Sequence, residues 1–492
     1  MSTLIIKQGS QTHTVDFDPP QKLYDLLRQA GVQAMHPCGG RGVCGKCAVM
    51  LEGLVSAPND AELRCGVRLS CQAVILGDAT VILPQSTAMQ IESGSGHDLA
   101  PVQPMPGRIG AAIDIGTTTL ALQLYSLSDG RCLGGATMLN PQTSVAADVI
   151  GRMDAALKGN GEALRKCVED AVSTMLHSAC AQANVNPGHV DALVITGNTT
   201  MLYLLTGRSP EPLSHAPFVA DHLFGETGEL LGRACYYPPC LHAFVGADTA
   251  CALLASSMLE RSETSLLCDI GTNGEIALWQ QGRLSVSSTA AGPAFEGAGI
   301  SCGCGSIPGA IDRITVANGR LYPHTIGEKT PVGLCGSGLV DAVAALLATG
   351  FMDETGMMDD DEYPLANNVV ITQKDIRAVQ LAKAAIAAGM ASLLHEAGCT
   401  AQDVTCTYVA GGFGSHLHIR NASAIGLLPA GLAERVKVIG NAALDGAAML
   451  LMDTGLRWKL DSLASVTKHV RLDGNAFFSQ RYIDEMFFPE AE

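Results

Sequence analysis

Residues 110–122 read GAAIDIGTTTLAL and residues 266–278 read LLCDIGTNGEIAL, so the tetrapeptide Asp-Ile-Gly-Thr occurs twice in the chain. Each copy consists of an apolar run, an acidic residue, a turn of glycine and threonine, and a second apolar run. This pattern predicts a strand, a tight turn and a return strand. Two unrelated hairpins that share a tetrapeptide are the plain alternative, but the matching apolar flanks favour an internal duplication. We therefore predict two similar lobes, each turning one hairpin toward a shared cleft.

The chemistry of these two turns suits a phosphorylated ligand. Glycine allows backbone N–H groups to approach phosphate oxygens, and threonine hydroxyls supply further donors. Asp114 and Asp269 occupy the same place in the two copies, where they can hold a hydrated Mg²⁺ between the lobes. The predicted ligands of phosphate and Mg²⁺ are Asp114, Gly116, Thr117, Thr118, Asp269, Gly271, Thr272, Asn273 and Gly274.

The paired hairpins resemble those of the superfamily of acetate kinases, sugar kinases, heat-shock chaperones and actin, whose members bind ATP between two ribonuclease H-like lobes. The resemblance implies ATP and Mg²⁺ as ligands. It also implies an adenosine motif at Gly411, Gly412 and Phe413, which follow the β-rich residues 404–408. Asp248 precedes the second hairpin at about the distance where chaperone-like members place the acid that orients the attacking water. A helix N-cap is the structural alternative for Asp248, because aspartate favours that position.

A second motif, residues 38–47 (CGGRGVCGKC), places three cysteines and four glycines in ten positions. Thiolates are the soft ligands of iron-sulfur clusters, and three close cysteines with a distant fourth suit a [2Fe-2S] centre. The distant ligand is Cys71, which precedes the apolar residues 73–76, although Cys65 also lies downstream. Structural zinc and unrelated buried cysteines are the alternatives, but the unequal gaps of five and two residues differ from paired zinc knuckles. The predicted cluster ligands are Cys38, Cys44, Cys47 and Cys71.

The residues around this motif predict a small α+β domain. Residues 3–7 and 13–17 alternate between apolar and polar side chains as in a hairpin, and residues 23–30 suit a short helix. Strand, strand, helix, cluster loop and strand is an order that resembles the β-grasp fold of [2Fe-2S] ferredoxins.

The composition then divides the chain into three parts. Residues 84–108 lose the hydrophobic pattern and are rich in Pro, Gly, Ser and Gln, which is typical of a linker. We predict a β-grasp ferredoxin domain over residues 1–83, this linker, and a bilobal ATPase domain over residues 109–492. The fold class is α/β with a small α+β domain, and the larger part is a duplicated, ribonuclease H-like fold of the actin and sugar kinase type. Within that part, Thr372 followed by Asp375 predicts a helix with a capping box.

The composition of the 492-residue chain excludes several classes of partner. Its net charge is −17 and its 31 Lys and Arg residues form no dense basic block, which argues against nucleic acid. Neither a secretory signal nor an uninterrupted apolar span of about 18 residues is present, which argues against a membrane. The cysteine-rich chain suits a reducing compartment, so we expect a cytoplasmic protein.

Cys302 and Cys304 lie in the glycine-rich residues 290–309, which read equally well as turns, and we assign them no metal.

The amino-acid sequence of the larger part resembles that of the reductive activators of corrinoid-dependent enzymes. This resemblance implies an ATP-hydrolysing reductase that returns an inactive Co(II) corrinoid on a partner methyltransferase corrinoid protein to Co(I). A low-potential electron donor would supply the electrons through the [2Fe-2S] cluster. Longer members carry an extra small domain or a C-terminal iron-sulfur module, for which this chain has no room, and whether it forms a homodimer is left open. The residues that carry the resemblance are 140–142 (NPQ), 148–150 (DVI), 196–201 (TGNTTM), 269–275 (DIGTNGE), 374–376 (KDI), 382–386 (AKAAI) and 440–447 (GNAALDGA).

Three other functions fit parts of the pattern. A redox-gated metabolite kinase would use the same ATP cleft to phosphorylate a small molecule. A related ATPase activates 2-hydroxyacyl-CoA dehydratases, but such activators resemble homodimers that share a [4Fe-4S] cluster and lack a ferredoxin domain. A non-enzymatic redox sensor would keep the cluster and show no ATP turnover.

Overall fold

The computed structural model describes residues 2–8, 11–30, 32, 47–65, 67–83, 98–366, 368–412, 417–429 and 431–490. Three predicted site residues, Cys38, Cys44 and Phe413, lie outside this part of the chain. The chain forms two compact units, Met1–Ala88 with Pro141–Ala155, and Met89–Asn140 with Ala156–Glu492. Each unit is described by itself below, and the predicted domain limits at residues 83 and 109 stay a prediction.

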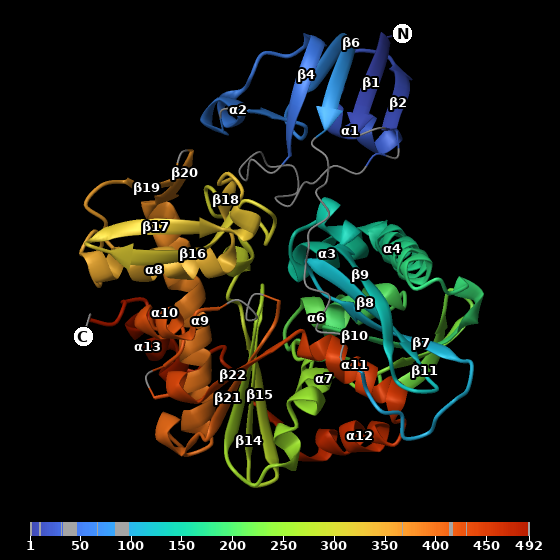
Figure 1. The fold of residues 1–492 in the computed structure, drawn as a ribbon, viewed down its shortest axis with the longest axis vertical. Helices are drawn as coiled ribbons and strands as arrows, with labels where there is room; N and C mark the ends of the chain where they lie inside the picture. The colour runs from blue at the N-terminus through green and yellow to red at the C-terminus, as the bar shows by residue number, and fades with distance from the viewer. Residues whose placement is uncertain are drawn as a thin grey trace. The chain divides into compact units, whose positions relative to one another are not determined.

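The first unit contains a mixed β-sheet and short helices (Figure 1). Its strands are β1 (Ser2–Gln8), β2 (Gln11–Phe17), β3 (Gln21–Lys22), β4 (Ala48–Val55), β5 (Arg68–Leu69) and β6 (Val74–Leu83), and its helices are α1 (Leu23–Gln29), α2 (Asp60–Cys65) and α3 (Val149–Ala155). The strand order is β2-β1-β6-β4-β5, with β3 paired to β6. β1 runs antiparallel to β2 and parallel to β6, whereas β4 runs antiparallel to β6.

The core of this sheet lies beneath α1. Leu23, Leu26 and Leu27 of the helix are buried with strand residues such as Leu4 and Ile6. The burial follows from the alternation in the sequence, because every second residue of a strand faces the same side. The predicted hairpin and short helix are confirmed, and the unit has the β-grasp arrangement.

The second unit is organised by two six-stranded sheets among the described residues. The first lobe has β7 (Ile109–Ile115), β8 (Thr119–Ser126), β9 (Cys132–Leu139), β10 (Val190–Gly197), β11 (Glu226–Leu230) and β12 (Arg233–Tyr237). The second lobe has β13 (Ser265–Ile270), β14 (Gly274–Gln280), β15 (Arg283–Thr289), β21 (Cys406–Ala410), β22 (Val436–Gly440) and β23 (Thr467–His469).

Five strands of each sheet repeat one topology, as the duplicated tetrapeptide predicts, whereas the sixth strand, β11 or β23, lies at opposite edges of the two sheets. In the first lobe, β7, β8 and β9 form an antiparallel meander, and β10 and then β12 add in parallel beside β7. In the second lobe, β13, β14 and β15 form the meander, and β21 and then β22 add in parallel beside β13. Both copies of Asp-Ile-Gly-Thr therefore lie at the turn between the first and second strands of their lobe.

Helices pack around these sheets, and two smaller sheets lie beside the second one (Figure 1). The helices are α4 (Gly161–Gln182), α5 (Thr199–Leu205), α6 (Glu211–Ser214), α7 (Ala247–Ser256), α8 (Gly336–Thr349), α9 (Gln373–Glu396), α10 (Ile419–Ala424), α11 (Ala442–Met452), α12 (Leu456–Val466) and α13 (Ala476–Asp484). The remaining strands are β16 (Ala310–Ala317), β17 (Arg320–Thr325) and β18 (Gly333–Leu334), which form one sheet, and β19 (Glu362–Ala366) and β20 (Val369–Thr372), which form another.

Two helices that occupy equivalent positions in the duplication, α7 and α11, cross at close range. A Cβ atom at Gly446 of α11 would lie 2.0 Å from the carbonyl oxygen of Cys251 in α7, so only glycine fits at this crossing. Each helix follows the last parallel strand of its lobe, and each therefore brings its first turn to the carboxyl ends of those strands.

The longest helix, α9, lies along the second sheet and packs against β14 and β15. It begins with the predicted capping box, in which Thr372 accepts from the N–H of Asp375 and the Asp375 carboxylate accepts from the N–H of Thr372. Among the described helices it alone is long and apolar enough to cross a membrane, but 78% of its most apolar window is buried inside the protein. Such burial is typical of a core helix.

The second half of the predicted linker packs on the second unit. The N–H groups of Leu99, Val102 and Met105 donate to the carbonyl oxygens of Gly130, Met452 and Leu127 at 2.8–3.0 Å. These bonds use backbone atoms, so the sequence carries no periodic signal for them. Residues 98–108 are thus part of the larger unit, whereas residues 84–97 lie outside the described chain.

Candidate functional site

The predicted phosphate-binding residues line a single cleft with a volume of about 880 Å³ in the second unit. Asp114 lies near the end of β7 and Asp269 near the end of β13, and the glycines and threonines of each turn follow directly. Gly274 is the exception, because it begins β14 and does not line the cleft. The cleft is bordered by Asp114, Gly116, Thr117, Thr118, Asp248, Asp269, Gly271, Thr272, Asn273, Gly411 and Gly412 among others.

Gly411 and Gly412 follow β21, the strand beside β13. Gly411 has a φ of +95°, and a Cβ atom there would lie 2.6 Å from Oδ1 of Asp269, so the position requires glycine. A Cβ atom at Gly412 would meet nothing within 4 Å. The first glycine therefore fits the backbone against the carboxylate, and the second borders the cleft. The adenosine motif stays a prediction.

The acidic side chains of the cleft repel one another. Burial, assisted by the charges of Asp248 and Asp269, raises the pKa of Asp114 to about 8, against a hydrogen bond from Asn441. Burial and the charges of Asp248 and Glu296 raise the pKa of Asp269 to about 7. Burial also raises the pKa of Asp248 to about 6, and burial with the neighbouring charges raises the pKa of Glu275 well above its usual range. The cleft is therefore short of positive charge.

A hydrated Mg²⁺ that arrives with a nucleotide fits this donor set. Carboxylate oxygens are the ligands that Mg²⁺ prefers, and it commonly takes one or two of them together with waters and phosphate oxygens. In the described part of the chain, no group of three His, Cys, Asp or Glu side chains is arranged to hold a metal alone. Asp114 and Asp269 would thus supply carboxylate oxygens to the hydrated ion, and the nucleotide would complete its coordination shell.

Asp248 lies in the first turn of α7 and borders the cleft. Its Oδ1 accepts from the N–H of Thr249 at 2.7 Å. The N-cap of α7 is Gly246, and no side chain caps the helix there. The N-cap alternative for Asp248 is therefore wrong, and the carboxylate remains available to the cleft.

Two further residues of the cleft, Asn441 and Glu296, have no role in the sequence-based prediction, although Asn441 lies within the family-like residues 440–447. Nδ2 of Asn441 donates to Oδ2 of Asp114 at 3.2 Å, while its Oδ1 accepts from the N–H of Leu444 as the N-cap of α11. Glu296 accepts hydrogen bonds from Thr118 and from Thr272, one from each phosphate turn. An N-cap preference could have located Asn441, but Glu296 is an isolated acid in a glycine-rich segment.

In the first unit, the described half of the predicted cluster site is assembled. The sulfurs of Cys47 and Cys71 lie 3.2 Å apart, and both side chains are buried beside Leu69. Their mutual hydrogen bond, together with burial, raises the pKa of the Cys47 thiol. Two buried thiols this close together are a fitting pair of ligands for one iron centre, because a metal would bind both as thiolates and displace the proton of each.

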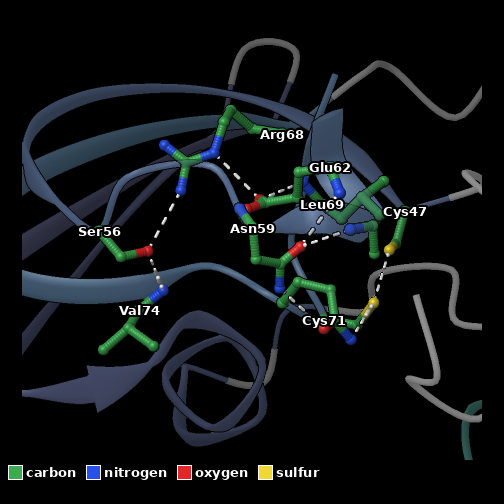
Figure 2. Close-up of polar contacts among 10 residues, drawn as sticks. Cys47, Ser56, Asn59, Glu62, Arg68, Leu69, Cys71 and Val74 are labelled. Atoms are coloured by element: carbon green, nitrogen blue, oxygen red, sulfur yellow. Dashed lines mark hydrogen bonds and ion pairs between the residues drawn. The ribbon is translucent and has the colours of Figure 1, made fainter. Parts of the chain in front are cut away.

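A buried carboxylate holds the turn that carries Cys71 (Figure 2). Oε1 of Glu62 accepts from the N–H of Leu69 at 2.9 Å and from Nε of Arg68 at 3.0 Å, and its Oε2 accepts from the N–H of Asn59 at 3.1 Å. Glu62 is 2% exposed. Burial opposes its charge, but these donors prevail and lower the pKa of Glu62.

Further hydrogen bonds connect the two cysteine-bearing segments, and one of them reaches a sulfur. The N–H of Ser70 donates to the carbonyl oxygen of Cys47 at 2.8 Å, which ties the two ligand-bearing segments together. Nε2 of Gln72 donates to Sγ of Cys71 at 3.5 Å, and Oε1 of the same amide accepts from Asn59 at 3.1 Å. Bonds of this kind orient thiolate ligands and tune the potential of a cluster.

Comparison with known proteins covers both units. Residues 5–76 match the 2Fe-2S iron-sulfur cluster binding domain, residues 109–261 match the RACo middle region, and residues 263–492 match the C-terminal domain of RACo, the ASKHA domain. The chain is 34% identical over 419 residues to the corrinoid activation enzyme RamQ of Eubacterium limosum, covering 77% of this chain and 70% of the relative. The chain belongs to the RACo family of corrinoid activators.

Two further proteins with corrinoid-related names are similar to this chain. A Co(II) methylated amine-specific corrinoid protein reductase of Methanosarcina barkeri is 26% identical over 405 residues, covering 74% of this chain and 73% of the relative. The solved structure of a reductive activator for corrinoid, iron-sulfur protein superposes with a TM-score of 0.73 at 26% identity, covering all of this chain and 99% of that one. The two RACo regions meet between α7 and β13, so the family boundary falls between the two halves of the duplication.

Proposed function

We propose that this protein is an ATP-dependent reductive activator, which returns the Co(II) corrinoid of a partner methyltransferase corrinoid protein to Co(I). The observation that carries the proposal is the pairing of two sites in one chain of the RACo family. One unit brings Cys47 and Cys71 together, and the other places two Asp-Ile-Gly-Thr turns on one cleft. The bound [2Fe-2S] cluster supplies a one-electron carrier, and ATP supplies the driving force.

The need for ATP follows from the redox chemistry. Reduction of Co(II) to Co(I) consumes one electron at a potential below that of common cellular carriers. Each 59 mV of mismatch in a one-electron step costs about tenfold in equilibrium. Nucleotide binding can favour a complex in which the corrinoid is more easily reduced, provided that the nucleotide states bind the partner differently. The closure of two lobes over a nucleotide is a motion suited to this coupling.

Each predicted site residue has a role in this proposal, and the positions of the described ones support it. Asp114 and Asp269 would hold a hydrated Mg²⁺, and the two phosphate turns would bind the phosphates of ATP. Asp248 orients the attacking water, since its carboxylate faces the cleft from the first turn of α7. The nucleoside lies against Gly411, Gly412 and Phe413. In the first unit, the cluster ligands are Cys38, Cys44, Cys47 and Cys71.

The ATPase domain is proposed to begin at residue 109, and residues 98–108 of the linker are hydrogen-bonded to it. A low-potential donor supplies the electrons, and neither nucleic acid nor a membrane is needed. A cysteine-rich chain that binds a cluster through thiolates suits the reducing cytoplasm.

The test is formation of Co(I), followed by its absorbance, in a mixture of the full-length protein, a low-potential reductant and a Co(II) corrinoid protein. We expect Co(I) with Mg-ATP and none without nucleotide. A metabolite kinase would instead release ADP only when a small hydroxyl or carboxylate compound is supplied. Co(I) formation at the same rate without ATP would refute the proposal.

A further inference from the structure

We propose that Glu296 is a latch that ties the two phosphate turns together in the nucleotide-free protein and is displaced by the phosphates of ATP. The inference rests on the proposed use of the cleft for ATP. It concerns a side chain that accepts from a threonine hydroxyl of each phosphate turn and therefore competes with a nucleotide for those donors.

The latch is one carboxylate with two partners. Its Oε2 accepts from Oγ1 of Thr118 at 2.5 Å, and its Oε1 accepts from Oγ1 of Thr272 at 2.8 Å. Thr118 lies in the turn between β7 and β8 of the first lobe, and Thr272 lies in the turn between β13 and β14 of the second. One side chain thus joins the two copies of the duplicated motif across the cleft.

A rigid turn fixes the position of this carboxylate. Glu296 ends the short 3-10 helix Pro293–Glu296, whose Ala294 and Phe295 are buried in the core of the second lobe. Gly297 follows in a left-handed conformation with a φ of +74°, and a Cβ atom there would lie 2.5 Å from the carbonyl oxygen of Cys304. The turn is therefore held on both sides, and Glu296 belongs to the second lobe while it reaches the first.

The latch and the nucleotide compete for the same donors. A threonine hydroxyl has one proton to donate, so it cannot serve a carboxylate oxygen and a phosphate oxygen together. The carboxylate and the phosphates are also both negative, and their repulsion is strong where water is partly excluded. Glu296 already acts on its surroundings in this way, since its charge contributes to the raised pKa of Asp269. Phosphate binding must therefore release Glu296 from Thr118 and Thr272.

This competition gives the latch a function. Without nucleotide it holds the lobes in one arrangement and stops the empty turns from binding other anions. With Mg-ATP the hydroxyls turn to the phosphates, and the first lobe loses its tie to the 3-10 helix. The relative position of the lobes then depends on the phosphate chain, which is the property that an ATP-driven activator needs.

The experiment is calorimetric titration of the full-length, cluster-loaded protein with the Mg²⁺ complex of the β,γ-imido analogue of ATP, and separately with adenosine. The Glu296→Ala variant should bind the imido analogue about tenfold more tightly than the wild type, because two bonds to a charged acceptor no longer have to be broken. Its affinity for adenosine, which has no phosphate, should be unchanged. The Glu296→Gln variant should shift affinity in the same direction by less, since an amide has a single acceptor oxygen.

Two further variants complete the design. Glu263→Ala removes an exposed carboxylate outside the cleft and should leave both affinities unchanged. In Glu296→Ala the freed Thr118 hydroxyl binds the phosphates. Adding Thr118→Val removes that hydroxyl and should reverse the gain in affinity. Weaker or equal binding of the imido analogue by both Glu296 variants, or equal tightening toward adenosine, would overturn the latch. Failure of the wild type to bind the imido analogue at all would instead remove the proposed function.

Discussion

Removing the charge of Asp114 should stabilise the metal-free protein at alkaline pH. Burial and the neighbouring carboxylates raise the pKa of this group from 3.8 to about 8. Between these two values the folded protein retains a proton that the unfolded chain has released. Stability therefore falls as the pH rises from about 4 to about 8, and the Asp114→Asn variant should lack this fall.

The magnitude follows from the pKa difference. One unit corresponds to about 1.4 kcal/mol, so a change of about four units sets an upper bound near 6 kcal/mol. The side chain is partly exposed in an open cleft, and water there screens the charge. We therefore expect the free energy of unfolding of the wild type to fall by about 1–2 kcal/mol relative to Asp114→Asn between pH 5 and pH 8.

Tryptophan fluorescence during denaturant unfolding provides the assay. Both tryptophans of the chain, Trp279 and Trp458, lie in the larger unit, so the signal reports on the fold that holds the cleft. Asp360→Asn, a change at an exposed aspartate, is the matched control and should retain the pH dependence of the wild type. Mg-ADP should flatten that dependence by supplying a cation. The reasoning is refuted if Asp114→Asn and the wild type lose the same stability between pH 5 and pH 8.

Three other changes test the two sites. Glu62→Ala should speed the loss of visible cluster absorbance on mild heating, since unpaired buried donors cost about 1–3 kcal/mol. The exposed control Glu52→Ala should not change this rate. Equal rates for the two variants would show that the Glu62 carboxylate does not support the Cys71 turn. Cys71→Ser should lose the [2Fe-2S] absorbance while Cys65→Ser keeps it, and the reverse result would exchange the two ligand assignments. Asp248→Asn should retain nucleotide binding and lower ATP turnover by at least about 100-fold, so unchanged turnover would remove its water-orienting role.

Local patterns predicted the parts of this protein that depend on local rules. The repeated Asp-Ile-Gly-Thr predicted two hairpins in equivalent places, because apolar alternation and a glycine turn are properties of a few adjacent residues. The capping box at Thr372 is equally local and is confirmed. A duplicated strand order then brings Asp114 and Asp269 to one cleft without further information.

The features that the sequence did not predict depend on distant residues. Glu296 contacts Thr118, 178 positions away, through a turn whose own residues read only as glycine-rich loop. Residues 98–108 look like linker, because backbone groups and not side chains attach them to the larger unit. Glu62 reads as an ordinary acid in the first turn of a short helix, and only the fold surrounds it with donors. Each case needs the tertiary structure, since no spacing along the chain encodes it.

The most direct test of the account separates the electron path from the ATP cleft within the full-length chain. Wild type, Cys71→Ser and Asp269→Asn are each mixed with a low-potential reductant, Mg-ATP and a Co(II) corrinoid protein, and Co(I) absorbance is recorded with ATP hydrolysis. We predict Co(I) from the wild type alone, with ATP hydrolysis retained in Cys71→Ser and cluster absorbance retained in Asp269→Asn. Co(I) formation by either variant at the rate of the wild type would contradict the claim that one chain uses both sites to reduce cobalt.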